Sequence, residues 1–520
     1  MTQVRGLQLF GIAAIAVTGC VHNPRTSPAV PIAETIRRFE MELRPVRGSS
    51  AEISRLDVHW ELNGPRDTSG RPFSVRAAVT YASVSGIADS IFALEVHDIH
   101  GEVATSRHDD PADRRGFPYY RHWTASRRVD YPVVVSYSAR PKRSGVVGPQ
   151  FALLGYAGGV SGAGSGFLVL PEDSSRAADI RVRWNLSGLA PGAIASSTFG
   201  ASAFGFVGAP TRLMQGYYMA GPLGRYPERG STSGFTAFWL GVPPFDPVTE
   251  MAWTARMYSY LRTFFRDTTA SSFAVFVRVL PGAAGYPGTA LENSFLLGTP
   301  ARHGDSVSTA PRETLTHEMV HHWALGIQGT QGSNTWFHEG LAVFYARLLP
   351  MRAGLDSVGS YGRSINATVR AYFANPLHNL TADSIGRMGF STGVGGASAQ
   401  NVPYTRGSLY FADVDAQIRA ASGGRRKLDD ILLSLFARIK GGERVDQNVW
   451  VAELTKEIGP SARAEFDSVI VRGKTIVPSS NAFGPCFERR PATLSAAGQT
   501  LEGFEWVRVG SVLESRCREW

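Results

Sequence analysis

Several features that would place this chain in a specialised class are missing from its sequence. The apolar run from Leu7 to Val17 is too short for a transmembrane helix, which needs about 20 residues. There is no low-complexity block and no convincing internal repeat. Lysine and arginine form no stripe with interleaved aromatic residues, so the net charge of +9 does not indicate a nucleic-acid partner.

The bulk composition is that of a globular protein. Hydrophobic residues make up 43% of the chain and aromatic residues 11%. A length of 520 residues exceeds what a single hydrophobic core usually holds, which favours two or three domains.

The N-terminus has the pattern of an exported lipoprotein. Arg5 followed by the short apolar run is typical of a signal peptide. Residues 17–20, Val-Thr-Gly-Cys, resemble a bacterial lipobox, whose cysteine is diacylated, and two or more acyl chains anchor a protein stably. We therefore expect lipidation of Cys20, and Val21 after it favours the outer membrane of a Gram-negative cell, facing the periplasm or the cell surface. Ordinary secretion with a chance cysteine is the alternative.

The pattern of the chain changes after this N-terminal segment. Residues 1–20 are expected to be a signal peptide, and residues 21–45 a tether that contains several prolines. From residue 46 to 215 apolar residues alternate with other residues, which predicts an antiparallel β domain. The clearest alternating runs are Phe73 to Tyr81, Val133 to Tyr137 and Ile180 to Leu186.

Residues 216–475 carry a mixed pattern that becomes mainly helical. A helix-like stretch covers Val248 to Phe265, and Phe273 to Leu280 is expected to be a buried strand. Helical spacing dominates from residue 311 to about 470. We assign residues 216–475 to an α+β domain and residues 476–520 to a small C-terminal segment.

The strongest chemical signal is His-Glu-Met-Val-His at residues 317–321, on an expected helix from Pro311 to Leu325. Histidines four residues apart lie one turn apart on one helix face, so the imidazoles of His317 and His321 can reach one metal ion. A catalytic zinc needs three protein ligands and a place for water, and two histidines with a carboxylate are a known set. Glu318 lies beside a ligand, where it can take a proton from that water.

A second helix is expected to supply the third ligand. Residues 326–335 are rich in Gly, Gln, Ser and Asn and are expected to form a loop, and apolar residues then recur at helical spacing from Phe337 to Leu348. Glu339 lies near the start of this helix, where it can turn back on the first. We therefore expect one zinc ion held by His317, His321 and Glu339. A buried polar helix pair without a metal is the alternative.

Two neighbouring histidines are not expected to bind the ion. His322 lies about 100° around the helix from His321 and cannot share its face. His338 precedes Glu339 and would point away from the ion if Glu339 points toward it. Both are expected to lie at the surface or behind the ligands.

The motifs resemble those of gluzincin metallopeptidases, specifically the glycyl-aminopeptidase family, which is related to aminopeptidase N. Residues 288–293, Gly-Thr-Ala-Leu-Glu-Asn, are similar to the exopeptidase signature Gly-x-Met-Glu-Asn and lie at close to the family distance before the HExxH pentad. Residues 336–340, Trp-Phe-His-Glu-Gly, and 403–407, Pro-Tyr-Thr-Arg-Gly, are similar to two further family motifs. The likeness covers about residues 285 to 435, with a weaker likeness upstream to about residue 45.

The resemblance implies an N-terminal antiparallel β domain followed by a thermolysin-like, mainly helical zinc peptidase domain. It implies an aminopeptidase that removes N-terminal residues from peptides in the bacterial cell envelope, with Glu318 as general base and Tyr404 stabilising the charge on the carbonyl oxygen. Glu292 would pair with the free ammonium of the substrate. Gly288 and Asn293 belong to the same substrate-binding segment, where the substrate backbone would lie along a strand edge. Tyr404 as a half-buried tyrosine starting a helix, and Glu292 as an exposed loop acid, are the alternatives.

The chain also departs from the family pattern. The loop between His321 and Glu339 is one residue shorter than in aminopeptidase N, and Arg406 stands where the family usually has lysine, which keeps the charge but not the geometry. The C-terminal segment shows no obvious PDZ-like module. Its two cysteines, Cys486 and Cys517, are expected to form a disulfide, as is natural for an exported pair.

Two rival functions remain open from the sequence. One is a zinc endopeptidase on the same scaffold, which would not need Glu292 to bind an ammonium group. The other is a catalytically silent peptide-binding surface lipoprotein that has kept the fold, against which the intact set of zinc ligands, Glu318 and Tyr404 argues.

Overall fold

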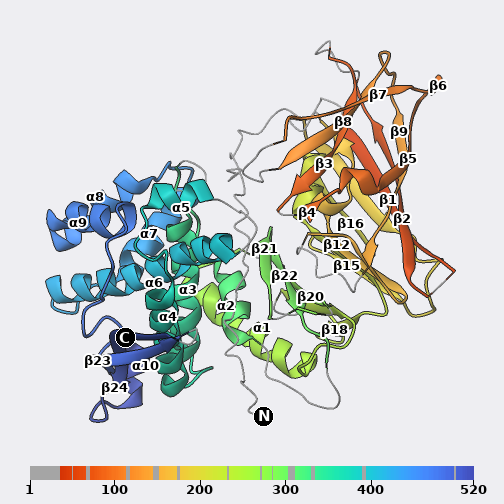
Figure 1. Cartoon of the computed structure of the whole chain (residues 1–520). Coiled ribbons are helices and arrows are strands. Elements are labelled where there is room, and N and C mark those ends of the chain that lie inside the picture. Colours follow the sequence, from red (N-terminus) through yellow and green to blue (C-terminus); the bar gives the residue numbers. More distant parts are fainter. Residues whose placement is uncertain are drawn as a thin grey trace. The chain divides into compact units, whose positions relative to one another are not determined.

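The computed structural model of the chain (Figure 1) combines mixed sheets with helices, so the α+β class expected from the sequence is confirmed. The described residues form two compact units. The helical unit comprises Trp253–Thr269 and Pro311–Trp520, and the strand unit comprises the described parts of Ser27–Ala252 and Ala270–Ala310. The structure describes residues 36–49, 51–65, 71–82, 84–112, 118–143, 151–172, 176–230, 234–269, 272–280, 282–283, 285–302, 311–329, 334–388, 394–496 and 499–520.

Alternating apolar side chains build the larger sheets of the strand unit. In β9 the side chains of Val133, Val135 and Tyr137 are buried while the residues between them are partly exposed, and β14 shows the same alternation. The inward side chains form one core, which includes Phe39 and Trp60. The predicted period of two therefore has a direct cause, because successive side chains of a strand point to opposite faces.

Three sheets carry this core. Their strand orders are β16-β14-β1-β2-β9-β5-β6, β10-β11-β12-β17-β15 and β13-β3-β8-β7, with β4 paired to β3. All pairs are antiparallel except β1 with β14 and β10 with β11. The strands are β1 (Arg37–Arg47), β2 (Ile53–Asn63), β3 (Ser74–Tyr81), β4 (Val84–Ser85), β5 (Ile91–Asp98), β6 (Gly101–Glu102), β7 (Thr105–Asp109), β8 (Tyr119–Ala125), β9 (Val133–Ala139), β10 (Lys142–Arg143), β11 (Leu154–Tyr156), β12 (Gly159–Ala163), β13 (Leu170–Pro171), β14 (Ala178–Trp184), β15 (Ile194–Ser197), β16 (Ala203–Gly208) and β17 (Tyr217–Gly221).

A fourth sheet of the strand unit carries the segment that resembles the exopeptidase signature. Its strand order is β18-β19-β20-β22-β21, so β21 lies at an edge. Every residue of β20 is buried, which agrees with the predicted buried strand. The strands are β18 (Gly224–Tyr226), β19 (Phe235–Leu240), β20 (Phe273–Val279), β21 (Gly288–Leu291) and β22 (Ser294–Thr299).

Helices make up most of the helical unit. The stretch predicted as a helix from Val248 to Phe265 is α1 (Pro247–Phe264), whose first residues belong to the strand unit. The other helices are α2 (Arg312–Val320), α3 (Thr335–Arg352), α4 (Val358–Ala374), α5 (Ala382–Met388), α6 (Val394–Ala421), α7 (Leu428–Lys440), α8 (Gln447–Ile458), α9 (Ser461–Phe466) and α10 (Glu514–Glu519). The two units are defined by packing. β1 belongs to the seven-stranded sheet, so residues 37–45 are not part of the expected tether, and the other domain boundaries stay a prediction.

The C-terminal segment closes on itself and on the helical unit. A hairpin of β23 (Phe487–Ala496) and β24 (Gln499–Arg508) precedes α10. A disulfide joins Cys486 to Cys517, with their Cα atoms 5.6 Å apart, so it ties the start of the hairpin to α10. Asn366 of α4 bonds the backbone of Trp506 in both directions, at 2.8 and 2.9 Å, which docks β24 on that helix.

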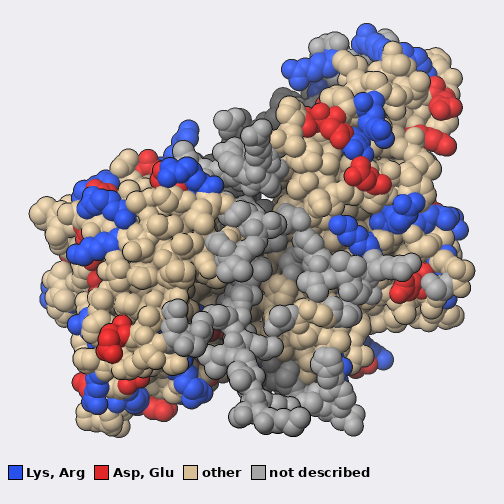
Figure 2. Space-filling view, in the orientation of Figure 1, with Lys and Arg blue, Asp and Glu red and all other residues tan. Residues whose placement is uncertain are grey.

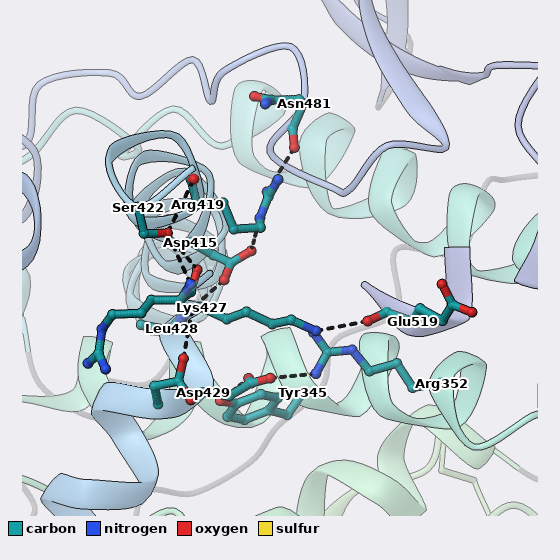
Figure 3. A network of polar contacts seen from close by, with 12 residues as sticks. Tyr345, Arg352, Asp415, Arg419, Ser422, Lys427, Leu428, Asp429, Asn481 and Glu519 are labelled. Atoms are coloured by element: carbon teal, nitrogen blue, oxygen red, sulfur yellow. Dashed lines mark hydrogen bonds and ion pairs between the residues drawn. The ribbon is translucent and has the colours of Figure 1, made fainter. Parts of the chain in front are cut away.

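A buried polar network connects α3 with this segment and with α6 and α7 (Figure 3). Asp429 accepts hydrogen bonds from the Tyr345 hydroxyl at 2.9 Å and from Arg352 Nη1 at 2.7 Å. Asp415 accepts from the backbone amide of Leu428 at 2.9 Å and from Arg419, its partner one turn along α6. Because hydrogen bonds satisfy these buried charges, the network can hold the ends of three helices in one arrangement.

The surface of the described residues carries both signs of charge. Figure 2 shows basic and acidic side chains interspersed over the visible face, with no continuous stripe of one sign. Within the described ranges, no helix combines the length and the hydrophobicity that crossing a membrane requires.

Candidate metal centre

Helix α2 carries the HExxH pentad and is almost entirely buried. Pro311 precedes it, and Glu313 in its first turn places a negative charge at the positive end of the helix. Glu313 also pairs with Arg347 of α3 at 2.7 Å, so the two helices that supply the expected ligands are joined directly.

The pentad helix ends at Val320, and the prediction that it continues to Leu325 is wrong. His321 is the C-cap of the helix and keeps helical backbone angles, φ −58° and ψ −21°. The spacing of one turn between His317 and His321 is therefore preserved although the helix ends at Val320, between the two histidines.

The turn after the helix is tightened by Trp323. Its amide bonds the carbonyl of Val320 at 3.0 Å, a three-residue spacing that is tighter than an α-helix. The indole donates to Asp267 at 2.9 Å and stacks on Phe265, with ring centroids 5.4 Å apart. Both partners follow α1 in the chain, so nothing in the sequence around the pentad could reveal this early end.

Helix α3, which carries Glu339 back to α2, packs very closely on α6. A Cβ atom at Gly340 would lie 2.6 Å from Cα of Gly407, and one at Gly407 would lie 2.3 Å from the carbonyl oxygen of Trp336. A side chain at either position would force the helices apart, so only glycine allows this contact. The glycines that end two of the sequence motifs thus have a packing role.

Three side chains converge where α2 and α3 meet. His317 Nε2 lies 3.1 Å from His321 Nε2, and Glu339 Oε2 lies 3.2 and 3.3 Å from these two atoms. Among the described residues these three form the one group of histidine, cysteine or acidic side chains that could hold a metal ion. The expected ligand set is therefore brought together by the fold.

The geometry of this triangle fits a zinc ion. Tetrahedral bonds of about 2.0–2.1 Å place two ligand atoms about 3.3–3.4 Å apart, close to the three separations observed. Glu339 Oε2 is buried and accepts no hydrogen bond within the described part of the chain. A cation held between the three atoms would give this buried oxygen a partner, which favours a metal site over a metal-free polar helix pair.

The protonation states of two ligands also suit a metal. Burial by itself would raise the pKa of Glu339, but the surrounding imidazoles, with His321 foremost, hold that pKa well below its ordinary value. Burial lowers the pKa of His317. At neutral pH the carboxylate is thus charged and the imidazole of His317 is neutral, which are the forms that bind a metal ion.

Glu318 and Tyr404 lie in the same buried region. Glu318 is 2% exposed. The Tyr404 ring is parallel to His317, with centroids 6.0 Å apart and planes 11° apart. Burial and then the charges of Glu339 and Glu318 raise the pKa of Tyr404 well above its ordinary value, so its hydroxyl keeps its proton. Tyr404 lies inside α6 and is 7% exposed, unlike the half-buried tyrosine at a helix start that was the alternative.

His338 lies outside the group of three possible ligands, as expected, and contacts the outer oxygen of Glu339. Its Nε2 lies 3.4 Å from Glu339 Oε1, and its ring centroid lies 5.9 Å from that of His321. The two oxygens of Glu339 therefore face different partners, Oε2 toward the α2 histidines and Oε1 toward His338. The helical spacing did not reveal this contact, because the long glutamate side chain brings its outer oxygen within reach of an adjacent residue. His322, by contrast, packs edge-on against Trp323.

The expected substrate-binding residues lie in the strand unit. Gly288 begins the edge strand β21, and Glu292 and Asn293 form the two-residue turn from β21 to β22. Asn293 has a φ of 47°, a left-handed conformation that asparagine tolerates better than most residues. Glu292 is already engaged: Arg212 Nε donates to its Oε2 at 2.7 Å, and Arg212 Nη2 donates to its Oε1. The sequence gives no sign that Arg212 belongs to this segment, because nothing in the local pattern links it to a turn much later in the chain.

Arg406 has a backbone role in the described fold. Its side chain is 3% exposed and donates to the carbonyls of His378 at 2.8 Å and Leu380 at 2.6 Å. Burial lowers its pKa. It thereby fastens the segment between α4 and α5 to α6. The predicted lipidation site Cys20 and the signal peptide lie outside the described residues.

Comparisons with known proteins bear on the fold. No protein-family model matches the sequence, and no curated protein is similar to it. Among solved structures, an aminopeptidase N family protein from Idiomarina loihiensis superposes with a TM-score of 0.66 at 12% identity, covering 88% of this chain and 79% of that chain. An M1 zinc metallopeptidase from Deinococcus radiodurans, bound to a Tyr-Ser-Ala substrate, gives a TM-score of 0.51 at 16% identity and covers 85% of this chain and 95% of that one.

A third similar structure is leukotriene A4 hydrolase from Saccharomyces cerevisiae, with a TM-score of 0.50 at 11% identity, covering 85% of this chain and 68% of the hydrolase chain. At such identities the similarity establishes the fold alone. The aminopeptidase N-like fold predicted from the motifs is thus confirmed.

Proposed function

We propose that this protein is a zinc-dependent metallopeptidase, and that it acts as an aminopeptidase on peptides in the bacterial cell envelope. The observation that carries the proposal is the buried triangle of His317, His321 and Glu339. Among the described residues, Oε2 of Glu339 accepts no hydrogen bond. The aminopeptidase N-like fold supports it. Glu318 and Tyr404 lie in the same buried region as the triangle, which favours an enzyme over a silent binding protein.

The chemistry follows from the residues around the triangle. A zinc ion held there would supply Lewis acidity, which makes water a better nucleophile and polarises a carbonyl. Glu318 would take the proton from the attacking water and pass it to the departing amine. The Tyr404 hydroxyl, which keeps its proton, would donate to the carbonyl oxygen as negative charge gathers there.

Recognition of the peptide would involve the β21–β22 hairpin. β21 is an edge strand, so an extended peptide backbone can bond along it, and Gly288 leaves room for its approach. In an aminopeptidase the Glu292 carboxylate would receive the free ammonium of the substrate, with Asn293 completing the turn. The pairing of Glu292 with Arg212 favours a second candidate, an endopeptidase on the same scaffold, since an internal peptide bond needs no ammonium site.

The place of action is part of the proposal. The apolar run before Cys20 and the residues around it support a lipid anchor in the outer membrane. Expression with a labelled fatty acid should label the wild-type protein, and Cys20→Ser should abolish the label and move the protein from the membrane to the soluble fraction. A Cys20→Ser protein that stays labelled would rule out this anchor.

Metal analysis combined with activity tests the catalytic proposal. We expect one zinc per chain, hydrolysis of a panel of aminoacyl fluorogenic amides, and loss of that hydrolysis on chelation that added zinc reverses. Glu318→Gln is the matched control, because it should keep the zinc and lose turnover by about a hundredfold to ten-thousandfold. Turnover that survives both chelation and Glu318→Gln would contradict the proposal.

A further inference from the structure

Arg212 holds Glu292 in a two-pronged ion pair within the strand unit. Nε of Arg212 lies 2.7 Å from Oε2, and Nη2 donates to Oε1, so both carboxylate oxygens are occupied. Charged fork-to-fork contacts of this kind are among the stronger polar interactions in proteins. The guanidinium also lies over the Phe206 ring, 4.8 Å from its centroid, which limits the directions in which it can swing.

The backbone around the pair is fixed from both sides. Arg212 belongs to the 3₁₀-helix η3 (Pro210–Gln215), which leads directly into β17. The Tyr217 hydroxyl of β17 donates to the carbonyl of Thr289 in β21 at 3.1 Å. Ser294 Oγ donates to the carbonyl of Glu292 at 3.0 Å. Arg212 and Glu292 are therefore presented to each other by a buried frame.

The pair changes what Glu292 can bind. A lone carboxylate attracts an ammonium group, whereas a carboxylate paired with a guanidinium belongs to a pair without net charge, and each of its oxygens already accepts one hydrogen bond. The ion pair uses Nε and Nη2 of Arg212, so Nη1 lies outside it. With 39% of the Arg212 side chain exposed, that nitrogen can donate to an approaching oxygen.

We propose that Arg212 is a specificity-determining residue that competes with the substrate ammonium for Glu292. A free N-terminus then gains little over an acylated one, and the acyl carbonyl of a blocked or internal peptide can accept a hydrogen bond from Nη1. The inference rests on the proposed function, which places Glu292 at the peptide N-terminus. It adds a substrate class: peptides whose N-terminal nitrogen is acylated, including longer chains cut internally.

Binding to the zinc-loaded Glu318→Gln protein tests this without turnover. The probes are two peptides that carry a dye at the C-terminus and differ only in a free or acetylated N-terminus, and the readout is the ratio of their dissociation constants. With Arg212 in place, we expect the two dissociation constants to differ by less than about tenfold. Arg212→Met should raise the preference for the free peptide by about tenfold or more, since a freed carboxylate can bind ammonium. Adding Glu292→Gln to Arg212→Met should remove the gain.

Controls separate the role of Arg212 from folding and from charge. Arg183→Met removes an ion pair with Glu42 elsewhere in the strand unit and should leave the ratio unchanged. Arg212→Lys keeps the charge but loses the fork, so its ratio should fall between wild type and Arg212→Met. If Arg212→Met does not fold, the binding ratio of Arg212→Lys still shows whether Arg212 sets the preference.

Two results would overturn the inference: a wild-type preference for the free peptide of a hundredfold or more, or a ratio that Arg212→Met and Arg212→Lys leave unchanged or lower. Failure of the proposed function would look different. In that case the wild-type protein would hydrolyse neither peptide, while the binding ratio would still report whether Arg212 masks Glu292.

Discussion

Glu339 in the helical unit and Glu292 in the strand unit are two motif glutamates with opposite surroundings. Glu339 is 2% exposed, and its Oε2 faces two imidazole nitrogens without a hydrogen bond among the described residues. The Glu292 side chain is 31% exposed, and Arg212 occupies both of its oxygens. One carboxylate is left needing a cation, and the other already has one.

The difference shows that a sequence motif fixes the type of residue, whereas the residues around it in the fold decide what it can bind. Both glutamates stand where the family resemblance places them. Burial of Glu339 beside two imidazole nitrogens favours the binding of a metal ion, because a buried anion is costly without partners. The Arg212–Glu292 pair is partly exposed, so separating it costs less than separating a fully buried pair, which suits selection among substrates.

The largest expected effect comes from removing the carboxylate of Glu339, and removing that of Glu292 is the contrast. Glu339→Gln should lose zinc and with it turnover by several orders of magnitude, since the ion would keep only two protein ligands. Glu292→Gln should keep one zinc per chain and change kcat/KM by less than about tenfold, because its charge is already neutralised. Metal content and amide hydrolysis of both purified variants check this. Full zinc occupancy in Glu339→Gln would show that Glu339 is not a required metal ligand, and the contrast with Glu292 would fail.

The next effect isolates the hydroxyl beside the triangle. Tyr404→Phe should lower kcat by about a hundredfold to a thousandfold and change KM little, because the donor acts where charge develops in the transition state. Tyr410→Phe is the matched control on α6 and should leave kcat near the wild-type value. If Tyr404→Phe changed kcat and KM equally, Tyr404 would serve substrate binding alone.

The sequence predicted the parts of the site that are local in the chain. The spacing of His317 and His321 follows from helix geometry, and Glu339 lies near the start of the next helix as expected. The alternation of apolar residues predicted β9 and β14, because a half-buried strand imposes that period. Each of these features depends on residues only a few positions apart.

The parts that the sequence did not predict depend on distant partners. The early end of α2 rests on Trp323 bonding Asp267, a residue after α1. The masking of Glu292 rests on Arg212, which precedes a different strand. Such contacts leave no periodic signal, since tertiary packing alone decides which side chains meet.

Opening the disulfide should lower the stability of the helical unit without changing the surroundings of either carboxylate. Cys486→Ser opens the disulfide of the C-terminal segment in the helical unit and should lower its free energy of unfolding by about 3–4 kcal/mol in the chain-entropy model. Cys517→Ser and the double variant should have the same effect, since each removes one bond. Denaturant unfolding measures the change, and zinc content and the peptide-binding ratio should stay as in wild type. An unchanged unfolding midpoint would show that the bond does not constrain the chain.

The smallest expected effect tests whether the polar contacts of α3 with α7 help to stabilise the helix that carries Glu339. Asp429→Asn leaves the buried guanidinium of Arg352, whose side chain is 7% exposed, without its charged partner on α7 (Figure 3). We expect a loss of about 2 kcal/mol in the free energy of unfolding, because hydrogen bonds to charged groups contribute about that much. Asp383→Asn is the control, since its pair with Arg387 is largely exposed and should contribute less than about 0.5 kcal/mol. Equal unfolding midpoints for the two variants would show that apolar packing alone holds α3, and with it Glu339, in place.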